Sequence, residues 1–120
     1  MAMVVRAFPL CVPRKEVEAF AAKVRERHAE TTAFYRKYGL AHESWYLQEV
    51  DGKAWVICCS AMKDPEAGGK EYAAATDSFG AWFKNEVTRL SGVNPNHTPL
   101  GPPSHQLFSW DDPAAPTNLA

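Results

Sequence analysis

The chain has 120 residues, a formal net charge of −1 and 22% charged residues. This length predicts one domain with a single hydrophobic core, residues 1–112, followed by a flexible tail at residues 113–120. Because the sequence has no strongly basic stretch, we expect no binding to nucleic acid or to an anionic membrane surface. The sequence shows no apolar run as long as a membrane span and no signal-type segment, which predicts a cytoplasmic protein.

The N-terminal part of the chain predicts one strand and one long helix. Residues 3–10 are rich in residues that favour strands. Residues 14–38 carry apolar side chains at helical spacing, and Gly39 follows as a typical residue just after a helix. His28 and Tyr35 lie on or beside the apolar stripe of this helix, so we expect them to lie on or near its buried face.

A β-hairpin is predicted next, from residues 40–50 and 53–62. Asp51 and Gly52 supply the positive φ angles that a tight hairpin turn requires. The flanking runs are rich in aromatic and β-branched residues, which favour a pleated and half-buried surface.

The region after the hairpin predicts one interrupted helix and one amphipathic helix. Residues 64–75 begin as a helix, but we expect Gly68 and Gly69 to break it. Residues 78–90, capped by Asp77 or by the serine that follows it, carry aromatic and aliphatic side chains at helical spacing.

The C-terminal region predicts a loop and a last strand. Residues 93–104 hold four prolines and one glycine in twelve positions, so we expect an ordered excursion or a lid. Residues 106–110 (QLFSW) predict a short strand. The order β-α-β-β-α-β then predicts an α+β, ferredoxin-like fold with a four-stranded antiparallel sheet and helices on one face. Because the other face carries aromatic side chains, we expect a homodimer that pairs two sheets into a dimeric α/β barrel.

Three short motifs support a resemblance to a known family. They are residues 42–48 (HESWYLQ), residues 82–84 (WFK), and the proline-rich stretch that leads to residues 107–110 (LFSW). With the element order, they resemble the dimeric α/β-barrel superfamily and, more narrowly, a bacterial group of small proteins of the DUF6176 type. The resemblance implies relatives that include cofactor-free monooxygenases, polyketide cyclases, muconolactone-type isomerases, stress-response barrels and haem-binding barrels. Fold alone does not choose among these functions.

Glu43 is the first candidate for a catalytic residue. It lies two residues before Trp45 and shares a strand face with it, so partial burial would raise its pKa toward the range of a general base or acid. The alternatives are a solvent-facing glutamate or a structural pair with Arg6. Arg6 could equally bind an anionic group of a substrate or pair with Glu43 or Glu49.

His28 and Tyr35 complete the catalytic candidates. Histidine titrates near neutral pH, so His28 could shuttle protons or hold a metal or haem, although such a histidine is more often a hydrogen-bonded core residue. Tyr35, like Arg6, could stabilise a developing oxyanion. No metal site is expected, because His97 and His105 match no zinc spacing and no cysteine pair accompanies them.

The expected substrate pocket is small, largely apolar and enclosed by the two sheets of the dimer. The residues expected to bind substrate are Arg6, Phe8, Trp45, Trp82 and Phe83. Aromatic residues at these spacings also commonly form core and dimer interface. The predicted function is a cofactor-independent isomerase, cyclase or monooxygenase that transfers a proton on a small aromatic or polyketide-like substrate. The alternatives are a non-catalytic ligand-binding or stress-response barrel, or a haem-binding barrel.

Overall fold

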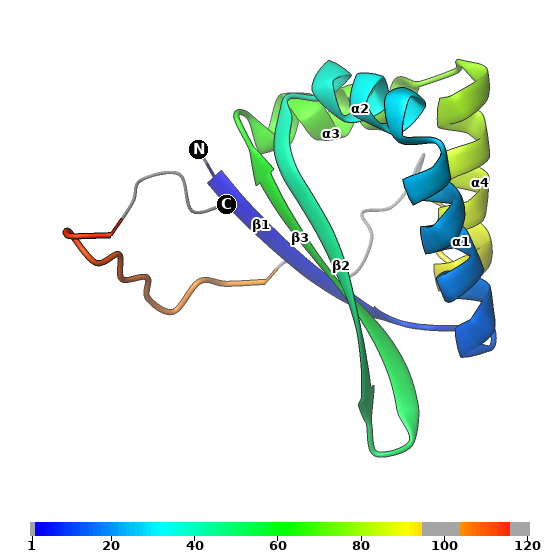
Figure 1. Ribbon diagram of the computed structural model, residues 1–120, viewed down its shortest axis with the longest axis horizontal. Coiled ribbons are helices and arrows are strands. Elements are labelled where there is room, and N and C mark those ends of the chain that lie inside the picture. Colours follow the sequence, from blue (N-terminus) through cyan, green and yellow to red (C-terminus); the bar gives the residue numbers. More distant parts are fainter. Residues whose placement is uncertain (1, 95–103, 116–120) are drawn as a thin grey trace.

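The computed structural model describes residues 2–94 and 104–115. In chain order the elements are β1 (Ala2–Pro9), α1 (Arg14–Glu26), α2 (His28–Lys37), β2 (Leu40–Val50), β3 (Lys53–Met62), α3 (Pro65–Ala74) and α4 (Ser78–Ser91). The strands form one antiparallel sheet in the order β1-β3-β2, and the helices lie on one of its faces (Figure 1). The predicted α+β class is therefore confirmed.

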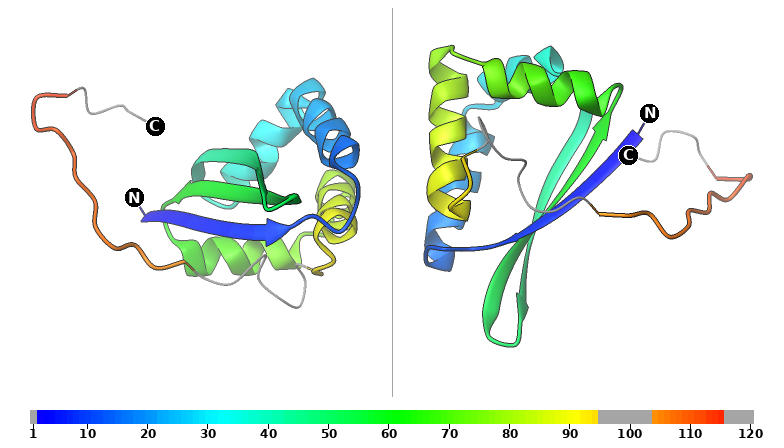
Figure 2. Two further views of the ribbon diagram at one scale, coloured as in Figure 1. Left: turned by 90° about the horizontal axis from the view of Figure 1, so that it is seen from below. Right: turned by 180° about the vertical axis from the view of Figure 1, so that it is seen from behind.

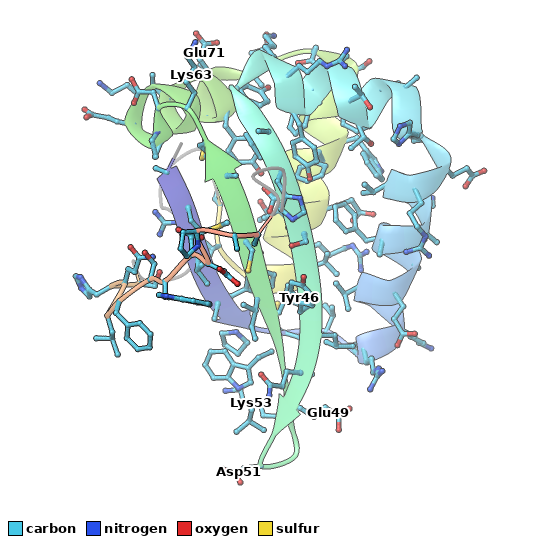
Figure 3. All side chains as sticks on the ribbon, turned by 60° about the vertical axis from the view of Figure 1, so that its left-hand side comes forward. Tyr46, Glu49, Asp51, Lys53, Lys63 and Glu71 are labelled. Carbon is cyan, nitrogen blue, oxygen red and sulfur yellow. The ribbon has the colours of Figure 1, made fainter. Side chains whose placement is uncertain are left out.

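The β2-β3 hairpin forms with the predicted strand bounds. Asp51 and Gly52 have φ angles of 52° and 75°, which are the positive values that the tight turn requires. β1 pairs with β3 only as far as Trp55. The tip of the hairpin therefore projects beyond the three-stranded part of the sheet (Figure 3).

The prediction of one long helix after the first strand is wrong, because the chain breaks at Arg27 into α1 and α2. Arg27 has φ −93° and ψ 46°. Its guanidinium lies 4.8 Å from the ring centroid of Phe79 in α4. The single hydrogen of the Thr31 hydroxyl is shared between the carbonyls of Val24 and Arg27, at 3.2 and 2.9 Å, and so adds a donor at the break. The break thus coincides with the contact between Arg27 and Phe79 in α4. The helical periodicity of the sequence carries no information about such a contact.

The predicted interruption at Gly68 and Gly69 is also wrong, because α3 is continuous. The Asp64 side chain accepts a hydrogen bond from a backbone N–H in the first turn and caps the helix. A Cβ atom at Gly68 would lie 2.7 Å from the carbonyl oxygen of Tyr38 and 2.4 Å from the methyl carbon of Met62. The missing side chain at Gly68 therefore lets α3 pack closely against the end of α2.

The predicted last strand, residues 106–110, does not form in the described part of the chain. Residues 104–115, here called the arm, contain neither helix nor strand. The Ser104 hydroxyl donates a hydrogen bond to the Val5 carbonyl in β1. The large apolar side chains that follow are exposed, and no strand among the described residues pairs with residues 106–110. Most of the predicted proline-rich excursion, residues 95–103, lies outside the described residues.

The hydrophobic core fills the space between the sheet and the helices. Its buried apolar side chains are Phe8, Val17, Phe20, Phe34, Tyr38, Val56, Cys58, Ala75, Phe79, Phe83, Val87 and Leu90. Residues two apart on a strand share a face, so Arg6 faces the helices together with the buried Phe8. The opposite face of the sheet, here called the open face, is not covered by the helices (Figure 2). Among the described residues, no helix is long and apolar enough to cross a membrane.

Candidate functional site

Glu43 lies on the face of β2 that packs against the helices. Trp45, two residues along, packs against Phe8 in β1 and Phe20 in α1, with ring centroids 5.9 and 5.4 Å away. The Glu43 carboxylate therefore enters the same interior layer. The predicted location of these side chains, between the sheets of two subunits, is wrong. They lie between the sheet and the helices of one chain, because the apolar rings on this face belong to the core.

The carboxylate of Glu43 has a close hydrogen-bond donor. Ser60, which lies opposite Glu43 in the β2-β3 register, donates its hydroxyl hydrogen to Oε2 of Glu43 at 2.7 Å. Burial raises the pKa of Glu43 from its ordinary value of 4.5 to about 7, and hydrogen bonding by Ser60 and Trp45 partly offsets this rise. Near neutral pH this carboxyl is therefore present in both protonation states.

Tyr35 in α2, Cys58 in β3 and Tyr72 in α3 lie within electrostatic reach of Glu43. Burial is the main cause of the raised pKa of each of these groups, and the negative charge of Glu43 is the next cause. The two phenols and the thiol therefore remain protonated at neutral pH and can donate hydrogen bonds. We call Glu43, Ser60, Tyr35, Tyr72 and Cys58 the interior cluster.

Arg6 brings a positive charge close to the interior cluster. It lies opposite Cys58 in the β1-β3 register, and its charge lowers the pKa of Cys58 against the larger effects of burial and Glu43. Glu43 lies opposite Ser60 in the neighbouring row of cross-strand partners. Arg6 and Glu43 thus occupy adjacent rows on one face of the sheet.

Phe83 forms an aromatic wall beside the interior cluster. It is 3% exposed, and its ring centroid lies 5.9 Å from that of Tyr35, 6.3 Å from that of Tyr72 and 6.5 Å from that of Trp45. Trp82, the adjacent residue in α4, is only half-buried. Trp82 packs against Phe20 and Phe79, with ring centroids 5.6 and 5.4 Å away.

His28 is not part of the interior cluster. It is exposed at the first turn of α2, where its backbone carbonyl accepts a hydrogen bond from the Thr32 hydroxyl. The expectation that it lies on or near the buried face is wrong, because the break at Arg27 interrupts the helical phase on which that expectation rests. Tyr35, two turns further along α2, does lie in the interior as predicted.

Outside the interior cluster, the described residues offer a groove but no metal site. Residues 2–94 and 104–115 contain no group of three or more His, Cys, Asp or Glu side chains that could hold a metal ion. An open groove of about 290 Å³ lies between α2 and the start of α4. Its lining residues are Glu30, Ala33, Phe34, Lys37, Asp77, Ser78 and Phe79. None of these residues belongs to the interior cluster.

Sequence reasoning missed Ser60 and Tyr72. The hairpin turn fixes the cross-strand partners, so the Ser60 position opposite Glu43 follows from counting back from Asp51 and Gly52 along both strands. No comparable signal exists for Tyr72, because its place depends on how α3 packs against the aromatic side chains of α2 and α4. Cys58 carries no sequence signal for a lowered pKa, and the structure agrees, since its pKa is raised.

Comparisons of the chain with protein-family models, with curated proteins and with solved structures found no match. The described residues define a small α+β protein with a partly buried carboxyl group between a three-stranded antiparallel sheet and four helices. The interior cluster is the basis on which we infer a function.

Proposed function

We propose that this protein is a cofactor-independent enzyme of the dimeric α/β-barrel type that transfers a proton on a small aromatic or polyketide-like substrate. One observation carries the proposal: the Glu43 carboxylate lies on the aromatic inner face of the sheet, where the neutral Ser60 hydroxyl donates a hydrogen bond to it at 2.7 Å. The raised pKa of Glu43, about 7, supports it, because a general base is most effective when its pKa lies near the working pH.

The proposed first step removes a proton from a carbon next to a substrate carbonyl. The proton moves to the Glu43 carboxylate, and the electron pair of the broken C–H bond moves into the carbonyl to form an enolate. The protonated phenols of Tyr35 and Tyr72 are suited to donate hydrogen bonds to the enolate oxygen. Isomerisation follows when Glu43 returns the proton to another carbon. Cyclisation follows when the enolate carbon forms a bond to a second carbonyl carbon, whose π electron pair moves to its oxygen as an alkoxide that takes the proton back from Glu43.

The dimeric barrel is part of this proposal. The antiparallel order β1-β3-β2 matches three of the four strands of the ferredoxin-like arrangement. Within residues 2–94 and 104–115, no fourth strand pairs with the other edge of β1. The open face carries exposed apolar side chains, including Met3 and Tyr46. Pairing two open faces would remove both from water.

A non-catalytic ligand-binding or stress-response barrel is the second candidate. The close Ser60 hydrogen bond favours it, because a hydroxyl that satisfies a buried carboxylate can serve the fold alone. The two functions differ in what happens when the charge of Glu43 is removed.

The test is deuterium exchange at the acidic carbon of an aromatic 1,3-diketone in heavy water, followed by NMR with the wild type, Glu43→Gln and Glu49→Gln. Glu49 is the matched control, because it lies on the same strand and pairs with Arg14 at an exposed site. We expect wild type and Glu49→Gln to accelerate exchange, and Glu43→Gln to lose roughly 10²- to 10⁴-fold. Equal rates for wild type and Glu43→Gln would favour the non-catalytic barrel.

A further inference from the structure

Large apolar side chains that are exposed in the described residues fall into two sets. On the sheet they are Met3, Tyr46 and Val50, which are 54%, 58% and 47% exposed. On the arm they are Leu107, Phe108 and Trp110, which are 93%, 85% and 74% exposed. Exposed apolar residues gathered in this way mark interaction surfaces more often than scattered ones do.

The first set lies on the open face. Side chains alternate between the two faces of a strand, and Trp45 faces the helices. Tyr46 therefore faces the other way, and so does Val50, which lies four positions further along β2. Phe8 faces the helices as well, which puts Met3 on the open face. The cross-strand register places Ile57 beside Tyr46 and extends the apolar surface across β3.

The arm lies on the side of the sheet that carries no helix, and it stands away from the body of the molecule (Figures 1 and 2). Residues 104–114 are all exposed, so the arm does not cover the open face of its own chain. The hydrogen bond from Ser104 to the Val5 carbonyl holds its first residue at β1.

We infer that two copies of this chain pack their open faces together and that each arm closes over the partner subunit, where Leu107, Phe108 and Trp110 become buried. This inference rests on the dimer that is part of the proposed function. It adds that contacts between each arm and the partner subunit stabilise this dimer. The segment predicted as a last strand would then find its partner strand in the second copy.

The dimensions of the arm fit this role. Its twelve residues can extend to roughly 40 Å, whereas three strands span about 15 Å. Burying two aromatic side chains and a leucine removes roughly 400–600 Å² from water for each arm. Two arms and the surfaces that they cover therefore approach the 1,200–2,000 Å² or so of a stable interface.

The distribution of charge also favours a second copy of this chain as the partner that covers the open face. Lys53 lies on the open face beside Trp55, with its ammonium 5.6 Å from the ring centroid. The arm carries Asp111 and Asp112 directly after its apolar residues. One chain thus holds both halves of a complementary surface, which is the condition for a symmetric dimer.

Sedimentation velocity over a concentration series tests the inference on the full-length chain. The arm variant is Leu107→Ser/Phe108→Ser/Trp110→Ser, and the control is Gln106→Ser/Ser109→Ala, which changes exposed polar residues of the same arm. We expect a wild-type dimer, an unchanged control, and a dissociation constant raised roughly 100-fold or more in the arm variant.

Two results would overturn the inference: an arm variant that dimerises as tightly as wild type, or a wild type that stays monomeric at micromolar concentration. The rate of Glu43-dependent deuterium exchange in the diketone is measured separately from the oligomeric state. An arm variant with normal association therefore refutes the arm contact and leaves the proposed chemistry to its own test.

Discussion

Glu43 is costly for the fold at the level of a single residue. A carboxylate removed from water needs a counter-ion or several donors, and the partly buried Glu43 accepts hydrogen bonds from two neutral groups, Ser60 at 2.7 Å and Trp45. The raised pKa of Glu43 expresses this cost, because burial disfavours the charged form. Natural proteins keep such residues mainly where function needs them.

Removing the charge of Glu43 should change how stability depends on pH. At low pH the Glu43 carboxyl is protonated in both the folded and the unfolded protein, so folding does not have to bury a charge. Between about 4.5 and 7 the unfolded chain loses this proton while the folded protein keeps it, so the stability of the wild type falls as pH rises through this range. Relative to Glu43→Gln, the wild type should lose about 3 kcal/mol of unfolding free energy between pH 4 and 8.

Urea unfolding of both proteins at several pH values measures this difference. A constant difference at every pH would show that the carboxyl is not desolvated. A wild type that becomes more stable than Glu43→Gln as pH rises would indicate a carboxylate stabilised by a positive partner such as Arg6.

Lys84 serves the fold, although it belongs to the WFK motif of the resemblance. It is 6% exposed, and its ammonium donates hydrogen bonds to the carbonyls of Ala73 and Ala75, at 3.0 and 2.6 Å. These carbonyls lie at the end of α3, where the helix leaves acceptors unsatisfied. Lys84 thereby links α4 to α3, the helix that carries Tyr72.

At the scale of elements, the position of α3 depends on close packing at Gly68. Gly68→Ala should destabilise the protein by about 1–3 kcal/mol, because the new methyl group meets a backbone carbonyl that cannot move freely. Gly69→Ala is the matched control, since a methyl group at that position would have nothing within 4 Å. It should stabilise the helix by about 0.5–1 kcal/mol. Thermal or urea unfolding measures both, and equal effects would contradict the proposed packing.

Local turn chemistry explains which elements could be predicted from sequence. Asp51 and Gly52 specify the hairpin turn, and with it the register that places Glu43 opposite Ser60, two of the five members of the interior cluster. The break at Arg27 could not be predicted, because it coincides with a contact to an aromatic ring in α4. Residues 106–110 of the arm have the composition of a strand, but pairing needs the edge of another strand, which the sequence of this segment does not identify.

At the scale of the whole molecule, the interior cluster and the open face lie on opposite sides of one sheet. If the proposed enzyme is a dimer, each subunit should therefore hold a complete interior cluster of its own. Tyr46→Arg, on the open face, should weaken dimerisation while Glu43-dependent deuterium exchange stays within about threefold of wild type. Parallel measurements of light scattering and exchange rate check this. Exchange lost together with the dimer would mean that the partner completes the site.

The protonation of Glu43 in the folded protein decides whether the proposed chemistry is possible at neutral pH. A carbon-13 NMR titration of the glutamate side-chain carboxyls, with Glu43 assigned from the signal missing in Glu43→Gln, measures it directly. We expect a midpoint of about 7 for Glu43. A midpoint near 4.5, the ordinary glutamate value, would show a well-solvated carboxylate and would contradict the assignment of Glu43 as the general base.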